Sequence, residues 1–248
     1  MHMKTRLIYL SLLLLVVISA SSQTYNQLWK KVDQLEADDL PLSALDETKR
    51  IYNKAKVERQ IPQMMKAYLT MMTYRGRISP DSITMDLKRL EEWPDLDIQN
   101  RAVLYSILGG EYISRDFEKG NRYLHLSLKD SLALVDYPAN RLAPMICSEK
   151  TSQLYMNDNL FDLLARRAIL YWKQNQWNVQ RDSILQDIQQ TYESLLGIYK
   201  RKGMRSAWLL TALDAYPFDV KQQQKWIVEY GDLDVCAEVY LNLSGRLN

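Results

Sequence analysis

Apolar residues recur at helical spacing along almost the whole chain after residue 23, and no stretch alternates convincingly with a period of two. The pattern therefore predicts an all-α fold. The segments predicted to be helical are 25–37, 41–59, 62–76, 79–93, 97–112, 117–135, 160–173, 181–202, 204–216, 220–230 and 233–243.

Several helix ends carry recognisable sequence signals. Pro41 and Pro62 stand where helices begin, a position at which the missing N–H of proline costs least. Ser79-Pro80-Asp81 combines a hydroxyl cap, a proline and an acid in the first turn. Gly76 is predicted to end a helix. Gly109-Gly110 lies inside a helical pattern, where each glycine costs about 1 kcal/mol relative to alanine, and this predicts close packing against a neighbouring helix.

The connections between the predicted helices are short, which favours antiparallel neighbours. Antiparallel helix pairs in a row predict a degenerate tetratricopeptide-like α-solenoid. Residues 42–74 have the length of one such repeat, but no second segment matches them well, so an irregular helical domain is the alternative. The loop-rich region 136–158, bounded by Pro138 and Pro144, is a possible sub-boundary within a domain over 23–248.

The first 22 residues have the order of a secretory signal peptide. Lys4 and Arg6 precede an apolar run over 7–18, and small residues follow at 19–22. The run is short for a membrane anchor, the alternative interpretation, because a spanning helix needs about 20 residues. We therefore expect cleavage after Ser22, no stable membrane insertion, and an extracytoplasmic location in the periplasm or cell envelope.

Charge argues against nucleic acid as a partner. The chain has 32 Lys and Arg residues and 30 Asp and Glu residues. Two of the basic residues, Lys4 and Arg6, belong to the predicted leader, so the remaining chain is close to neutral. It has no strong basic field to attract a phosphate backbone.

Two cysteines, Cys147 and Cys236, are the only thiols. In an oxidising compartment they could form a disulfide. Two buried free thiols are an equally good interpretation, because cysteine is among the most buried residue types. Their spacing does not suggest a zinc site.

No local motif points to catalysis, a cofactor or a metal. His125 is the only histidine after the leader, and we expect it to be structural. The carboxylate pairs Glu91-Glu92 and Asp38-Asp39 are adjacent in sequence, so they do not face each other on a helix. No G-x-S-x-G and no glycine-rich phosphate loop occurs. We therefore expect that the protein is not an enzyme. An envelope hydrolase that uses scattered carboxylates is a remote alternative. The methionines at 64, 65, 71, 72 and 85 fit a helix core better than a binding groove.

Several phrases of the chain resemble the amino-terminal helical region of long-form bacterial alpha-2-macroglobulin family proteins. These phrases are residues 25–32 (YNQLWKKV), 39–45 (DLPLSAL), 51–55 (IYNKA), 62–69 (PQMMKAYL) and 159–169 (NLFDLLARRAI). The resemblance implies a very large secreted or envelope protein similar to protease traps, with macroglobulin β-sandwich domains and often a Cys-Gly-Glu-Gln thioester. This chain departs from that pattern, because neither cysteine lies in a thioester motif and no run of β-strands is predicted.

The sequence and the resemblance together predict a non-enzymatic helical module that makes protein–protein contacts within a protease-trapping system. Its expected partners are downstream macroglobulin domains, envelope proteins or proteases. The alternative is a freestanding scaffold of the cell envelope that binds peptides or proteins and has no link to protease control.

Overall fold

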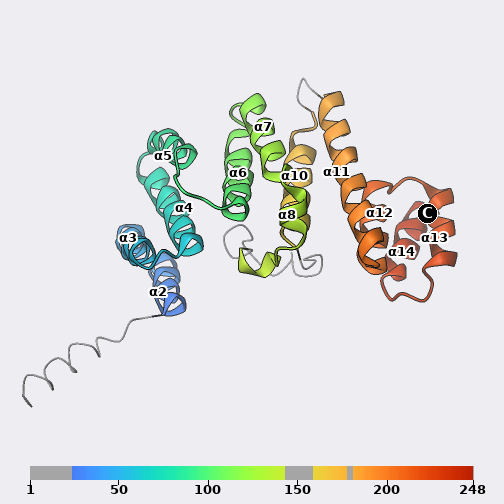
Figure 1. Cartoon of the computed structure of the whole chain (residues 1–248), viewed down its shortest axis with the longest axis horizontal. Coiled ribbons are helices and arrows are strands. Elements are labelled where there is room, and N and C mark those ends of the chain that lie inside the picture. Colours follow the sequence, from blue (N-terminus) through green and yellow to red (C-terminus); the bar gives the residue numbers. More distant parts are fainter. Residues whose placement is uncertain (1–23, 143–158, 178–180, 248) are drawn as a thin grey trace, which may run out of the picture. The chain divides into compact units, whose positions relative to one another are not determined.

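The structure is a computed structural model that describes residues 24–142, 159–177 and 181–247, and all regular elements within these ranges are helical (Figure 1). The prediction of an all-α fold is therefore confirmed. The helices are α2 (Tyr25–Ala37), α3 (Pro41–Val57), α4 (Ile61–Ile78), α5 (Ser82–Glu91), α6 (Ile98–Tyr112), α7 (Phe117–Leu128), α8 (Ser131–Val135), the 3-10 turn η1 (Ala139–Arg141), α10 (Leu160–Asn175), α11 (Arg181–Lys202), α12 (Arg205–Ala215), α13 (Val220–Glu229) and α14 (Cys236–Leu247).

Packing divides the chain into two compact units, residues 1–86 and 87–248. The predicted leader, 1–22, and most of the predicted sub-boundary at 136–158 lie outside the described residues. Within the described ranges, no helix is both long enough and apolar enough to cross a bilayer.

In the first unit, α3 packs against both α2 and α4. The apolar faces predicted for these helices form the core, with Val32, Ile51 and Ala55 almost fully buried. The methionine pattern is largely core as well, since Met65, Met71 and Met72 are buried, but Met85 on α5 is 60% exposed. Most of this methionine-rich face therefore stabilises the fold.

Two tight turns connect these three helices, and each has a non-glycine residue in the left-handed region. Asp39 has φ 56° and Arg59 has φ 54°. In both turns the next amide donates back to the helix, Leu40 to Leu35 and Gln60 to Ala55, each at 2.9 Å. This 6→1 hydrogen bond is the mark of a Schellman ending. Because Arg59 is the left-handed residue, α3 ends at Val57 and not at the predicted Arg59.

The predicted stop at Gly76 is wrong, because α4 continues to Ile78. Gly76 instead provides space at a contact between helices. A Cβ built there would lie 3.0 Å from the side chain of Ile83 on α5. Ser79 caps the end of the helix, and its amide donates to Arg75 O at 2.7 Å.

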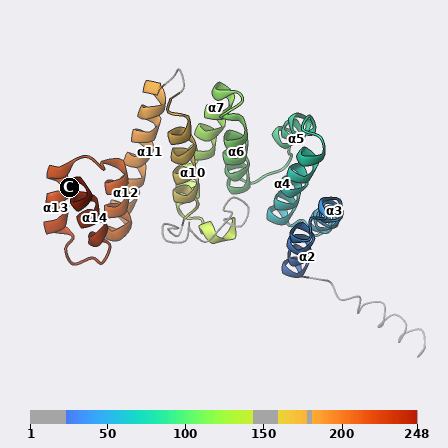
Figure 2. The same ribbon diagram turned by 180° about the vertical axis from the view of Figure 1, so that it is seen from behind.

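In the second unit, α6 and α7 form a helical hairpin, α10 packs on both, and α11 and α12 follow in order (Figure 2). The close packing expected at Gly109-Gly110 is present. A Cβ on Gly109 would lie 2.5 Å from Leu124 on α7, and one on Gly110 would lie 2.4 Å from the Tyr171 ring on α10. The two glycines thus allow α6 to approach two helices at once.

One predicted helix is divided into two. The segment 117–135 forms α7 and α8, which are separated by Lys129 and Asp130. Lys129 N donates to Leu126 O, three residues earlier, at 3.4 Å, so α7 ends in a tighter 3-10 turn. A new helix then begins at Ser131. Among the other predicted ranges, α2 and α11 have the predicted bounds, and the last helix is shifted from 233–243 to 236–247.

Candidate functional site

A buried carboxylate marks the first turn of α10. Asp162 is 1% exposed, and its amide donates to the side chain of the cap residue Asn159 at 2.9 Å. The sequence places an asparagine before an amphipathic helix, which explains this helix start. A charge buried so completely requires hydrogen-bond donors close by.

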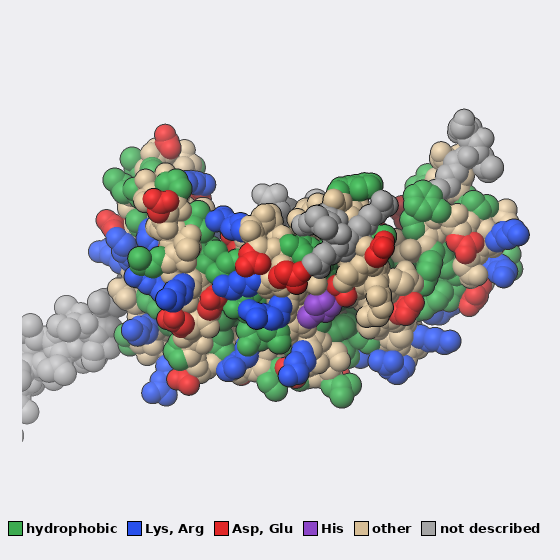
Figure 3. Space-filling model, turned by 90° about the horizontal axis from the view of Figure 1, so that it is seen from above, with side chains coloured by type: hydrophobic (Ala, Val, Ile, Leu, Met, Phe, Trp, Pro, Cys, Tyr) green, Lys and Arg blue, Asp and Glu red, His purple; other side chains and the backbone are tan. Residues whose placement is uncertain are grey.

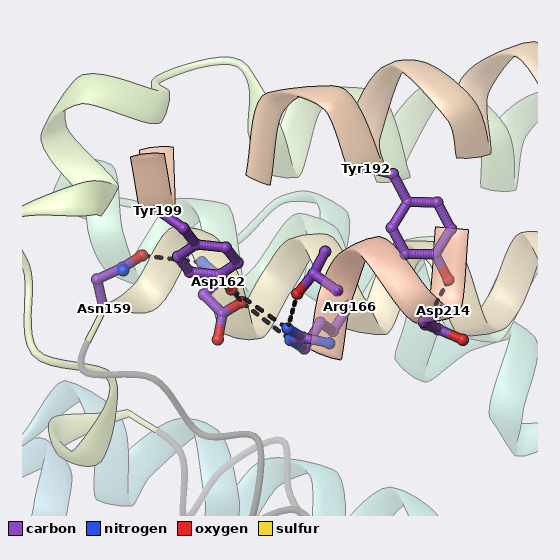
Figure 4. A network of polar contacts seen from close by, with 7 residues as sticks. Asn159, Asp162, Arg166, Tyr192, Tyr199 and Asp214 are labelled. Atoms are coloured by element: carbon purple, nitrogen blue, oxygen red, sulfur yellow. Dashed lines mark hydrogen bonds and ion pairs between the residues drawn. The ribbon is translucent and has the colours of Figure 1, made fainter. Parts of the chain in front are cut away.

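Side chains of α10 and α11 supply those donors, and α12 joins the arrangement through Thr211 (Figure 4). Arg166, one turn later on α10, donates from Nε to Asp162 Oδ1 at 2.9 Å, and the hydroxyl of Tyr199 on α11 donates to the same oxygen. Arg166 also donates from Nη2 to Thr211 Oγ1 on α12 at 2.7 Å and to the Tyr199 hydroxyl at 3.3 Å. We call Asn159, Asp162, Arg166, Tyr199 and Thr211 the α10 network.

A second polar link lies farther along the same helices. The hydroxyl of Tyr192 on α11 donates to Asp214 Oδ2 on α12 at 2.5 Å, and Lys173 Nζ of α10 lies 3.2 Å from Asp214 Oδ1. Burial, and then the hydrogen bond to Asp214, raise the pKa of Tyr192. This tyrosine therefore keeps its proton at neutral pH and acts as a donor.

The electrostatics of the α10 network favour one fixed protonation state. Burial, the largest single effect, would lower the pKa of Arg166, but its charge interactions and hydrogen bonds with Asp162 and Tyr199 together outweigh burial, so the pKa is raised. Burial and the negative charge of Asp162 raise the pKa of Tyr199. Neither group exchanges a proton near pH 7, so this arrangement holds three helices together and is poorly suited to acid–base chemistry.

A different side of α10 is partly exposed to solvent. Five residues at spacings of three and four form a strip that runs along α10 and ends just beyond it. We call this the α10 strip: Arg167, Leu170, Tyr171 and Gln174 on the helix, and Trp177 two residues after its end. Leu170 is 51% exposed and Trp177 is 76% exposed. The Arg167 guanidinium lies 5.1 Å from the centre of the Tyr171 ring. Arg167 and Tyr171 are half-buried, and the Tyr171 ring packs beside Gly110 of α6. The exposed members of the strip are therefore Leu170, Gln174 and Trp177.

His125 occupies a structural position, half exposed on α7. Its Nε2 lies 3.1 Å from Asp187 Oδ2 on α11, and its ring lies 5.4 Å from that of Trp172 on α10. Trp172 in turn donates from Nε1 to Asn121 Oδ1 at 2.7 Å. These contacts join α7, α10 and α11.

The carboxylate pairs singled out in the sequence serve helix ends and helix contacts. Glu91 pairs with Lys119 of α7, while Glu92 is exposed. Asp38 accepts from the Gln34 side chain at 2.9 Å, and Asp39 forms the left-handed turn residue. In neither pair do the two carboxylates share a contact that would suggest a common reaction.

Cys236 is 3% exposed in a cluster with Trp226 and Val239, whereas Cys147 lies outside the described residues. A disulfide between the two stays a prediction. The described ranges contain no group of three His, Cys, Asp or Glu residues arranged to hold a metal ion. On the face seen in Figure 3, acidic and basic side chains are intermingled.

Sequence reasoning did not find the α10 network or the α10 strip. The i, i+4 spacing of Asp162 and Arg166 is a usable signal for their ion pair. Nothing in the sequence indicates that Tyr199 and Thr211 would join it from other helices. The comparison of the chain with models of known protein families, with curated proteins and with solved structures gives no match.

Proposed function

We propose that this chain is a non-enzymatic helical module that makes protein–protein contacts outside the cytosol. The observation that carries the proposal is the α10 strip. Leu170 on α10 and Trp177 just after the helix expose large apolar surfaces, while most of the rest of α10 is packed. Tryptophan, tyrosine and arginine are the residues most enriched at interaction hot spots.

The rigid support behind the strip favours a binding role. The α10 network fixes α10 to α11 and α12 through Asp162, Arg166 and Tyr199. A strip held by such bonds loses little conformational freedom when a partner binds, and this lowers the entropic cost of association.

Part of the second unit supports the finer proposal of a tetratricopeptide-like solenoid. On α6, Tyr105, Leu108, Gly109 and Tyr112 have the spacing W-x2-L-G-x2-Y, with tyrosine in place of tryptophan. On α7, Gly120 and Leu124 match the spacing A-x3-F. Two of these motif positions also pack against each other, because Gly109 and Leu124 are in close contact. In a solenoid, helices such as α6 and α10 would line an extended binding face.

A non-enzymatic role is supported by the use of the candidate catalytic groups elsewhere. His125 contacts Asp187 and Trp172, Glu91 pairs with Lys119, and Asp162 lies in the α10 network. Each of these groups holds helices together.

The predicted signal peptide supports an extracytoplasmic location, and the phrases at 25–32, 39–45, 51–55, 62–69 and 159–169 support a place in an alpha-2-macroglobulin-like protease-trapping system. Terminal-peptide mass spectrometry of the native protein from its source cells tests both. The proposal expects a first residue near Gln23 and peptides of macroglobulin domains attached to, or co-purifying with, the chain. A retained leader would contradict the location, and a chain without such domains would favour the freestanding scaffold.

The contact role has its own test. A tagged chain is expressed in the source cells and purified next to the variants Leu170→Glu and Leu132→Glu. Leu132 is a matched control because it is an 84% exposed leucine on α8 and is not part of the strip. We expect a protein partner that Leu132→Glu retains and Leu170→Glu loses. Equal recovery with all three chains would overturn the role assigned to the strip.

A further inference from the structure

The last helix, α14, has a second apolar face that no described residue covers. Its inner face is packed through Cys236 and Val239, which are buried against Trp226 of α13 and Leu209 of α12. Its outer face presents Tyr240, 55% exposed, and Leu241, 64% exposed, together with exposed Ala237 and Ser244.

The spacing of the outer residues is that of a helix-packing seam. Positions 237, 240, 241 and 244 follow the i, i+3, i+4, i+7 rule, and at about 100° per residue they cover one continuous side of the helix. Ala237 and Ser244 are small, and they flank the large Tyr240 and Leu241. Small residues beside large ones let a second helix approach closely and accept its side chains.

The charges around this face of α14 indicate what kind of partner helix it would accept. Residues 226–247, which include α14, contain four carboxylates, Glu229, Asp232, Asp234 and Glu238, and one basic residue, Arg246, near the end of the helix. Only Asp232 is held in an ion pair within the described part of the chain, by Arg205 of α12 through two contacts of 2.6 and 2.9 Å. Asp234 and Glu238, beside the seam, are exposed.

We propose that the outer face of α14 docks an amphipathic helix of a partner protein, one whose apolar stripe is flanked by Lys or Arg. The apolar stripe would cover Tyr240 and Leu241, and the basic flank would meet Glu238 and Asp234. This surface is separate in sequence from the α10 strip, and the proposal does not depend on the function assigned to that strip.

Two labelled peptides of about 18 residues, long enough for five turns, test the proposal by fluorescence anisotropy with the purified protein. Both carry the same Leu/Ala stripe, and they differ only in flanks of Lys or of Glu. We expect the Lys-flanked peptide to bind at least tenfold more tightly, with an affinity that falls as salt is added.

Substitutions at exposed positions complete the test, because they leave the packed face of α14 intact. Leu241→Glu should weaken binding of the Lys-flanked peptide at least tenfold, and Glu238→Lys should reduce or reverse the preference between the two peptides. Val228→Glu, 86% exposed on α13, is the matched control and should leave binding unchanged.

Three results would overturn the proposal. The first is equal binding of both peptides, and the second is no binding of either. The third is a protein that light scattering shows to be a dimer and that Leu241→Glu converts to a monomer, since a second copy of the chain would then cover the face.

Discussion

Gly120 on α7 lies directly against the backbone of Ile113, just after α6. A Cβ built on Gly120 would lie 2.4 Å from both Cα and N of Ile113, closer than any real contact. Because backbone atoms cannot move aside as a side-chain end can, Gly120→Ala should separate α6 from α7. We expect a loss of about 1–3 kcal/mol in the free energy of unfolding, measured by urea denaturation.

Gly197→Ala is the matched control for this prediction. Gly197 lies inside α11, five residues before its end, and a Cβ there would have only the Arg201 guanidinium within 4 Å, at 3.5 Å. With no close contact to disturb, the higher helix propensity of alanine should decide the effect, and Gly197→Ala should stabilise the fold by up to about 1 kcal/mol. If both variants changed stability in the same direction, the close contact at Gly120 would not be the cause.

The α10 network should respond to the loss of a single hydroxyl. Tyr199→Phe removes one of the donors to the buried Asp162 and one acceptor of Arg166. We expect a loss of about 1–3 kcal/mol, since an unsatisfied buried polar group costs that much. Tyr240→Phe, at an exposed tyrosine, should change stability little. Similar losses in the two variants would argue against the network as a clamp of α10, α11 and α12.

The left-handed turns offer stabilising changes. Asp39 and Arg59 adopt φ values that favour glycine, and non-glycine residues there cost about 1 kcal/mol. Asp39→Gly and Arg59→Gly should therefore each raise the melting temperature. The reverse change, Gly203→Ala at φ 67°, should lower it. No gain in the first two variants would show that the Asp and Arg side chains offset the backbone strain.

Glu91 should make stability depend on pH in the acid range. Burial, the largest single effect, would raise the pKa of Glu91. The hydrogen bonds from Lys119, Tyr112 and Tyr123 and the charge of Lys119 together outweigh burial, so the pKa lies below the ordinary 4.5. A carboxyl with a lowered folded pKa stabilises the protein above its unfolded pKa, and this stabilisation is lost as the pH falls through the folded value.

The measurement is the melting temperature of Glu91→Gln and wild type from pH 7 to pH 3. The variant should be less stable at pH 7, and the difference should shrink below about pH 4.5, where the unfolded carboxyl takes up its proton. Glu92→Gln, at the exposed neighbour, is the control and should show a smaller difference. A difference for Glu91→Gln that is constant with pH would contradict the ionic role of Glu91.

Helices with local start signals could be predicted from the sequence. Asn159 is a recognisable cap before α10, and the apolar spacing of residues 160–173 indicates the buried face of this helix. The close approach at Gly109 and Gly110 was also foreseeable, because glycine inside a helix needs a packing reason. The left-handed turns at Asp39 and Arg59 were not, because neither residue is glycine.

The candidate site was less accessible to sequence reasoning than the helices. Tyr199 lies 37 residues from Asp162, and only the packing of α10 on α11 brings them together. The exposure of Leu170 depends on which side of α10 its neighbours cover, a property of tertiary structure that a single helical pattern does not contain.

Protein contact through the α10 strip is the central proposal, and site-specific photo-crosslinking in the source cells tests it most directly. A photoreactive amino acid is placed at position 170 on the strip and, in a matched chain, at position 132. We expect a discrete protein adduct from position 170 that is absent from position 132. No adduct at either position, or the same adducts at both, would contradict it.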